Sequence, residues 1–230
     1  MKKIMIILSL LILSFGANAK VYDFKNLYKT LGYSKDSNYF NAIPDELMSI
    51  ESYIDKYDSF YTEINNYLRY YPAPYEYNVS GPEDSKEMVK NIDHVIGRAP
   101  KIPSDIILFR GLTLKWHQNK AFEIGEEYFD KAYISTSTSF SVADYFAKGL
   151  SDEKRINEKK AIFALYFEQK NVKGLLIDQG EDEVILPHGQ RFKIMQKKTL
   201  KEYDYYLVQV CEKVCKESIE KKDVLQWWTN

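Results

Sequence analysis

The hydrophobic pattern of this 230-residue chain changes near residue 105. Before that point, apolar side chains from Ile50 to Leu68 recur at three- and four-residue steps, which predicts one amphipathic helix, ended by Tyr71–Pro74. A second helix is predicted over Asp84–Ile96. After that point the chain carries short apolar or β-branched runs, which are typical of strands. We expect strands at residues 106–109, 133–138, 161–167, 183–186, 191–195 and 205–210.

One short helix interrupts the predicted strands. Ser141–Asp144 fits a capping box that would open a helix running through Lys148. Because helices come first and strands follow, the sequence predicts an α+β fold rather than alternating β-α-β units. No internal repeat or long linker divides the chain, so we expect a single domain over residues 20–230.

The first 19 residues have the three parts of a secretory signal peptide. Met1–Lys3 is basic, Ile4–Phe15 is apolar, and Ala17–Ala19 is an A-x-A cleavage site. We therefore expect a bacterial protein that is secreted after cleavage near Ala19. A membrane anchor is the alternative, although the apolar run is short for a span. No later segment approaches 18 apolar residues, so stable membrane insertion is not expected.

Composition excludes two other classes of protein. Hydrophobic residues make up 45% of the chain and aromatic residues 15%, which is too apolar for a disordered protein. The 32 Lys and Arg residues are balanced by 33 Asp and Glu residues, whereas a nucleic-acid-binding protein needs a basic surface. Nucleic acid is therefore not an expected partner.

The cysteines and histidines do not form a metal-binding pattern. Cys211 and Cys215 are the only cysteines, and His94, His117 and His188 are scattered along the chain. Export permits a disulfide between the two cysteines, and a pair of reduced thiols is the alternative. The chain also lacks the common serine-hydrolase, zinc-protease, P-loop and dinucleotide-binding motifs.

Arg110 follows a short apolar run and is itself followed by Gly111. A guanidinium at a strand end can bind a phosphate or carboxylate through two parallel hydrogen bonds, and glycine lets a ligand approach the backbone. A structural ion pair is the other interpretation of Arg110.

Two further polar groups stand at strand positions. Ser135 and Ser137 would share one face of a strand, as would Glu181 and Glu183 at the entry to the next apolar run. Two neighbouring carboxylates suit acid–base chemistry or the stabilisation of a developing cation. A polar edge strand and an acidic surface turn are the alternatives.

The order of these three groups resembles that in the mono-ADP-ribosyltransferase toxins of the R-S-E class, in particular the clostridial C2- and iota-like, arginine-specific branch. Their pattern is an arginine on a strand, then aromatic-x-Ser-Thr-Ser, then Glu-x-Glu entering an apolar strand. Tyr61–Arg69 is similar to the helix that walls the NAD cleft in that family. The resemblance extends from about residue 40 to residue 210.

This resemblance implies an NAD cleft between two packed, mainly antiparallel sheets, with NAD as a substrate and no metal. Arg110 would hold the pyrophosphate or the adjoining ribose. Glu183 would bind the nicotinamide ribose and stabilise the cation that forms as nicotinamide leaves. Ser135 would hold Glu183 in place. Further NAD contacts are implied for Tyr61, Asn65, Gly111 and Phe146, with the Phe146 ring against the nicotinamide.

In the family, a glutamate at the position of Glu181 goes with arginine acceptors. The implied partner is therefore a host protein that presents an arginine, and actin is among the known targets of secreted members. The family's loop usually carries an aromatic residue where this chain has Asp178, which leaves the target surface open. The chain has no room for a translocation domain, so a separate delivery partner is one expected route into a cell.

Three other functions remain alternatives. An NAD glycohydrolase would use the same residues with water as the acceptor. A glycosidase would use Glu181 and Glu183 but would leave Arg110 unexplained. An exported binding module that has lost catalysis would not need Glu183.

Overall fold

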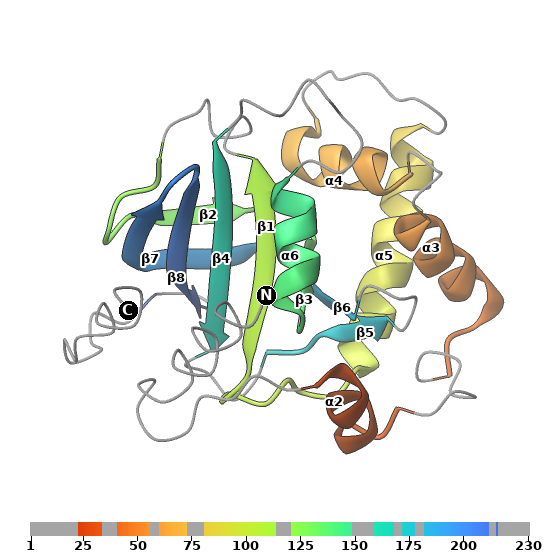
Figure 1. Cartoon of the computed structure of the whole chain (residues 1–230). Helices are drawn as coiled ribbons and strands as arrows, with labels where there is room; N and C mark the ends of the chain where they lie inside the picture. The colour runs from red at the N-terminus through yellow and green to blue at the C-terminus, as the bar shows by residue number, and fades with distance from the viewer. Residues whose placement is uncertain are drawn as a thin grey trace.

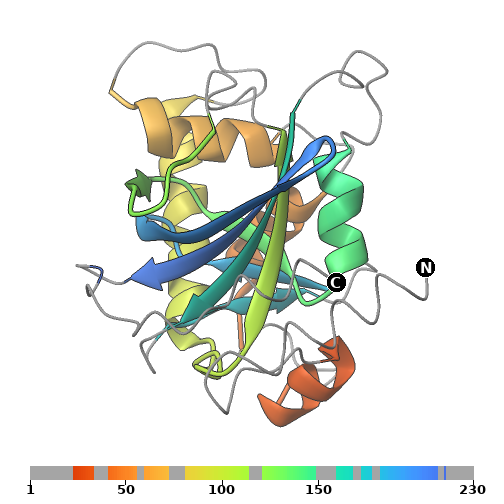
Figure 2. The ribbon, with the colours of Figure 1, turned by 60° about the vertical axis from the view of Figure 1, so that its left-hand side comes forward.

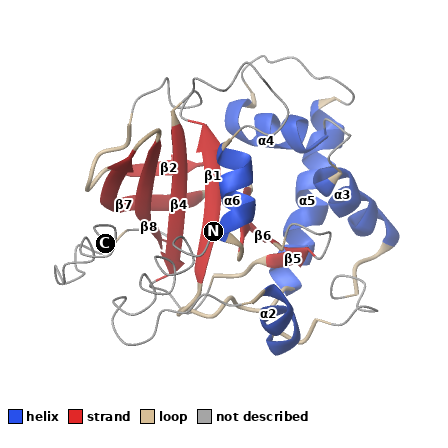
Figure 3. Cartoon of the chain, in the orientation of Figure 1, coloured by secondary structure: helices blue, strands red, loops and turns tan. Residues whose placement is uncertain are grey.

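The computed structural model describes residues 23–33, 41–55, 60–72, 81–113, 121–148, 159–167, 172–177, 182–211 and 215. These residues form five helices and eight strands (Figures 1 and 3). The helices are α2 Phe24–Thr30, α3 Pro44–Ile54, α4 Phe60–Tyr70, α5 Pro82–Arg98 and α6 Phe140–Ala147. The strands are β1 Ile107–Thr113, β2 Glu127–Asp130, β3 Ile134–Ser137, β4 Lys160–Phe167, β5 Leu175–Ile177, β6 Glu183–Leu186, β7 Gln190–Leu200 and β8 Tyr203–Cys211.

The strands are hydrogen-bonded in the order β2-β7-β8-β4-β1-β3-β6-β5. All neighbouring strands are antiparallel except β4 and β8, which are parallel. The link between β1 and β3 is a single register pair, Phe109 with Ser137, so the strands fall into two groups that are joined at one point. The α+β class is confirmed.

The two groups of strands enclose the main hydrophobic core. Leu176, Val184 and Leu186 from the β3-β6-β5 group pack in one cluster with Phe163 and Val208 from the β1-β4-β8-β7-β2 group. Helices α3, α4 and α5 cover the other face of β5 and β6, and α6 covers the other face of β1 and β4 (Figures 1 and 2). The resemblance implied two separate packed sheets, whereas the structure joins the strands into one eight-stranded, mainly antiparallel sheet through the Phe109–Ser137 pair, and the two parts of this sheet pack around one core.

The single helix predicted from Ile50 to Leu68 is wrong, because the structure has two helices there. The backbone leaves the helical conformation at Asp55, which caps α3, and α4 begins at Phe60. Ile50 and Ile64 belong to different helices but pack in the same cluster. Because both helices turn their apolar faces to one core, their side chains mimic a continuous helical period.

The boundaries of β1 and α6 also differ from the prediction. β1 does not end at Arg110, because its pairing with β4 continues to Thr113. Helix α6 begins at Phe140 with Ser139 as its N-cap, so the predicted capping box opening at Ser141 is wrong. The carboxylate of Asp144 instead accepts a hydrogen bond from the Tyr203 hydroxyl, at 2.8 Å.

Cys211 at the end of β8 is joined to Cys215 by a disulfide. Among the helices within the described ranges, none has the length and apolar content that a membrane span requires.

Candidate functional site

The register of β3 and β6 brings the serine segment to Glu183. Ser137 lies directly opposite Glu183, and Ser135 lies opposite Ile185. Because side chains alternate along a strand, Ser135, Ser137 and Glu183 share one face of the sheet. Tyr133 and Ile185 on that face pack against α3, α4 and α5, so the polar groups face the helical layer.

The hydroxyls of the serine segment fix the backbone on both sides of Glu183. Thr136 donates a hydrogen bond to the carbonyl of Val184 at 2.6 Å, and Ser137 donates one to the carbonyl of Asp182 at 3.1 Å. Asp182 has a positive φ of 48°, which turns the chain immediately before the strand. Thr136 and Ser137 thus position the carboxylate through its own strand, which the alternation of side chains alone did not suggest.

The Tyr53 side chain interacts with several of the predicted residues. Tyr53 lies on α3, is 3% exposed, and accepts a hydrogen bond from the Asn65 side-chain amide at 3.2 Å. Burial raises the pKa of this phenol; Asn65, Ser135 and the charge of Arg110 lower it, whereas the Glu183 carboxylate raises it. Ser135 thus interacts with the Tyr53 hydroxyl, and the charges of Arg110 and Glu183 influence its pKa. The joint binding of one ligand by Arg110, Ser135 and Glu183 stays a prediction.

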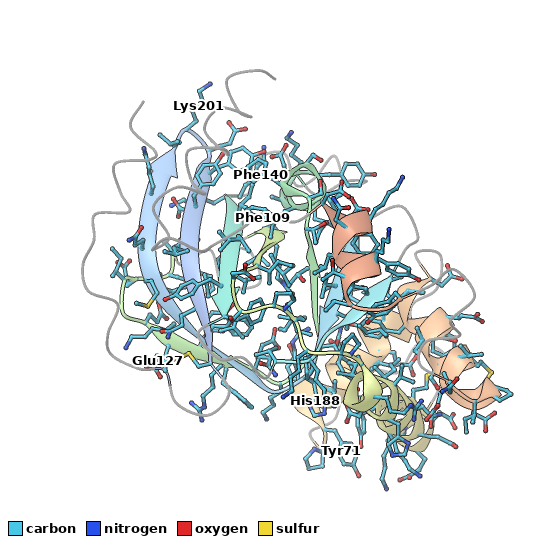
Figure 4. The ribbon with its side chains drawn as sticks, turned by 90° about the horizontal axis from the view of Figure 1, so that it is seen from below. Tyr71, Phe109, Glu127, Phe140, His188 and Lys201 are labelled. Carbon is cyan, nitrogen blue, oxygen red and sulfur yellow. A yellow bond between two sulfur atoms is a disulfide. The ribbon has the colours of Figure 1, made fainter. Side chains whose placement is uncertain are left out.

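Arg110 occupies the middle of β1 and points away from α6. Its neighbours Phe109 and Gly111 face that helix, and the Phe109 ring meets Phe140 of α6 edge to face (Figure 4). The Nη1 atom of Arg110 is buried and has no hydrogen-bond partner within the described ranges of the chain. A buried charged donor without an acceptor is costly, so the site suits a ligand that supplies one. A pyrophosphate fits this requirement.

The family to which the chain belongs follows from its sequence. The sequence model described as ADP-ribosyltransferase exoenzyme matches residues 20–217. The chain belongs to the ADP-ribosyltransferase exoenzyme family. Its members include bacterial toxins, and their reaction uses NAD. No curated protein sequence matches the chain.

Solved structures of other ADP-ribosyltransferases share the fold. The Vis toxin of Vibrio splendidus in complex with agmatine is 21% identical over 83% of this chain and 85% of its own, with a TM-score of 0.60. The Clostridium perfringens toxin BECa with NADH is 18% identical over 81% of this chain and 46% of its own, at 0.58. The C3 exoenzyme of Clostridium limosum is 16% identical over 88% of this chain and 100% of its own, at 0.56.

Gly111 is explained by helix packing in this member of the family. A Cβ atom there would lie 1.7 Å from the Ala143 carbonyl oxygen and 2.7 Å from the Ala147 amide nitrogen, both in the backbone of α6. Only glycine lets the helix approach β1 so closely. The backbone contact between Gly111 and NAD stays a prediction.

Asn65 is 4% exposed, and both ends of its side chain have protein partners. Its amide nitrogen donates to Tyr53, and its oxygen accepts a hydrogen bond from the backbone N–H of Tyr133 at 3.1 Å. The asparagine therefore ties α4 to both α3 and the start of β3. Tyr61, in contrast, is 47% exposed, and its ring meets that of Tyr53 edge to face.

The remaining predicted residues lie in different settings. Phe146 on α6 is 43% exposed and meets the Tyr145 ring edge to face, so its place against the nicotinamide stays a prediction. Glu181 lies outside the described residues, as does Asp178. No cluster of three or more metal-ligating side chains occurs in the part of the chain that the structure describes.

Sequence reasoning missed Tyr53 as a site residue. The helical pattern marked it as an apolar-face residue, and its signal is the same as that of its purely structural neighbours. Only its contact with Asn65, twelve positions away on another helix, separates it from them.

Proposed function

We propose that this protein transfers ADP-ribose from NAD to an arginine side chain of a target protein, with release of nicotinamide. The observation that carries the proposal is the buried Nη1 of Arg110, which has no hydrogen-bond partner among the described residues. The charges of Arg110 and Glu183 both influence the Tyr53 phenol, with which Ser135 interacts. A forked cation beside a hydroxyl and a carboxylate matches the charges of a dinucleotide that is losing its nicotinamide.

In the proposed reaction, Arg110 binds the pyrophosphate or the adjoining ribose, and Ser135 supports Glu183. The bond between the ribose C1′ and the nicotinamide nitrogen breaks, and nicotinamide leaves with the electron pair. Glu183 stabilises the positive charge that this leaves on the ribose. A guanidinium nitrogen of the target then bonds to C1′ and gives up a proton, for which Glu181 is the proposed acceptor.

Several further assignments complete the proposal. Tyr61 and Phe146, both exposed aromatic residues, would contact NAD. Arginine as the acceptor is supported by Glu181 and by the agmatine bound to Vis, because agmatine carries a guanidinium. Actin is one proposed target, reached with the help of a separate delivery partner. Secretion after cleavage near Ala19 is supported by the basic start, the apolar run and the A-x-A sequence of residues 1–19.

The test is incubation of the purified protein with labelled NAD and agmatine. We expect labelled agmatine from the wild type and none from the Glu183→Gln variant, because that variant loses the carboxylate charge. Glu181→Gln should abolish agmatine labelling while retaining hydrolysis of NAD. Release of free ADP-ribose alone by the wild type would indicate a glycohydrolase instead. Failure of the wild type to consume NAD would overturn the proposal.

A further inference from the structure

A second polar group lies behind the Glu183 site, on the side of α5. The hydroxyl of Tyr133 lies 2.7 Å from Asp93 Oδ1 and 3.0 Å from the Val89 carbonyl oxygen, and it donates its proton to this pair of acceptors. Burial and the adjacent Asp93 carboxylate raise the pKa of the Tyr133 phenol, so it remains a donor. Asp93 is thereby joined to a side chain that is 1% exposed.

His188 fixes the other oxygen of this carboxylate. Its Nε2 lies 3.1 Å from Asp93 Oδ2, and its ring meets that of Tyr133 edge to face. His188 belongs to the turn between β6 and β7, and it lies beside α5 (Figure 4). The orientation of Asp93 is therefore set by two partners, the Tyr133 hydroxyl and His188 in the turn after β6.

Tyr133 connects this group to the Glu183 site. Its backbone N–H donates to the Asn65 oxygen, and the Asn65 amide nitrogen donates to the Tyr53 hydroxyl. Tyr133 also immediately precedes β3 and lies two residues before Ser135, on the same face of the sheet. A shift of the Tyr133 ring would therefore be transmitted along two routes, to Tyr53 and to Ser135.

We propose that Asp93 is a positioning residue for the catalytic site, which it supports by holding Tyr133, and through Tyr133 both Asn65 and Tyr53. The inference rests on the proposed cleavage of NAD. Asp93 does not need to touch NAD, since its contribution is the placement of the Tyr53 hydroxyl relative to Ser135 and Glu183.

The exposure of the Asp93 and His188 side chains, 40% and 35%, argues for placement rather than stability as their role. Contacts between polar side chains this exposed contribute little to the free energy of unfolding. Small displacements of groups that position a reaction can, in contrast, cost a large factor in rate. A variant at this position should therefore affect turnover more than folding.

The chain offers a matched control in another part of the fold. Tyr206 is 0% exposed, and its hydroxyl donates to Asp204 Oδ2 at 3.0 Å. Tyr206 packs in the core between the two groups of strands, whereas Tyr133 packs beneath the helical layer. Tyr206→Phe thus removes a comparable tyrosine–aspartate hydrogen bond, in a different hydrophobic cluster from Tyr53.

The experiment compares steady-state NAD cleavage by the two tyrosine variants. Tyr133→Phe keeps the ring and the backbone N–H that Asn65 accepts, and we expect kcat to fall about tenfold with less than a twofold change in KM. Tyr206→Phe should keep kcat within twofold of the wild type, even though we expect it to lose as much thermal stability as Tyr133→Phe. Asp93→Asn, whose amide oxygen still accepts from Tyr133, should retain most of the activity that Asp93→Ala loses.

The outcomes separate this inference from the proposed function. An active wild type together with an unchanged kcat for Tyr133→Phe would overturn the positioning role alone. Equal losses of kcat in Tyr133→Phe and Tyr206→Phe would also overturn it, because the effect would then follow stability. A wild type without NAD cleavage would overturn the proposed function and the positioning role together.

Discussion

The arginines of the helical layer and the arginine of β1 differ in their hydrogen-bond partners. Arg98 on α5 makes two hydrogen bonds to the Glu46 carboxylate, at 3.1 and 2.6 Å. Arg69 on α4 makes two to Asp130, both at 3.1 Å, and so ties the helix to β2. Arg110 on β1, in contrast, has a buried Nη1 for which the described part of the chain supplies no acceptor.

The contrast separates the two paired arginines from the arginine that we propose binds NAD. A paired guanidinium already donates to a protein carboxylate, whereas the Nη1 of Arg110 has no acceptor among the described residues. Desolvating such a donor without an acceptor lowers the stability of the free protein, a cost that anion binding would reverse. Substitutions at the two kinds of arginine should therefore affect different measurements.

Arg110→Lys is expected to have the largest effect. Lysine keeps the positive charge but lacks the forked donors, so kcat/KM for NAD cleavage should fall roughly 100- to 1,000-fold. The thermal midpoint should stay the same or rise, because a buried donor without a partner is removed. Enzyme kinetics and thermal unfolding on the same preparations check both points.

Arg98→Lys is the matched control for that substitution. It loses part of a paired fork, so we expect lower stability and an NAD cleavage rate within twofold of the wild type. If both lysine variants lost activity to the same degree, the distinction between paired and unpartnered arginines would fail.

Gly111→Ala tests the close packing of α6 against β1, next to Arg110. The new methyl group would meet the α6 backbone at Ala143, so the variant should lose roughly 1–3 kcal/mol of unfolding free energy. Urea unfolding gives this value. Gly97→Ala on α5 is the control, since a Cβ there meets no described atom within 4 Å beyond its chain neighbours and the backbone of its own helix. Alanine favours a helix over glycine, so the control should be as stable as the wild type or more stable by up to about 1 kcal/mol. A fully stable Gly111→Ala would contradict the close approach of α6 to β1.

Local patterns predicted the parts of the fold that depend on local physics. The strands that begin at Ile107, Lys160 and Glu183 each contain a short apolar run, which is the main sequence signal of a buried strand. Helix α2 was missed although its cap, Asp23, accepts a hydrogen bond from the Asn26 N–H. The three-residue strand β5 was also missed, because so short a run has no clear period.

The parts that the sequence could not supply are the long-range contacts. The parallel pairing of β4 with β8 joins segments about 40 residues apart, and no local signal encodes it. The same holds within the site, where Tyr133 reaches Asn65 across 68 positions and Asp93 across 40. Arg110 and Glu183 were singled out by the order of the sequence motifs rather than by a local signal, and their roles toward NAD stay predictions.

The smallest expected effect is the pH dependence of the stability that the Arg98–Glu46 pair contributes. The hydrogen bonds from Arg98 lower the pKa of Glu46 more than burial of this 5%-exposed side chain raises it. Because the folded pKa lies below the unfolded one, the pair stabilises the protein above the unfolded pKa of about 4.3, and this stability is lost as the pH falls through the folded pKa. Arg98 is 40% exposed, so solvent screening limits the contribution to about 1 kcal/mol.

Urea unfolding from pH 7 to pH 3 should show Glu46→Gln less stable than the wild type at pH 7 and the two converging at the acid end. Glu83→Gln, at a side chain that is 80% exposed, should track the wild type throughout. A gap between wild type and Glu46→Gln that stayed constant with pH would mean that packing around Glu46, rather than its charge, supports the helical layer.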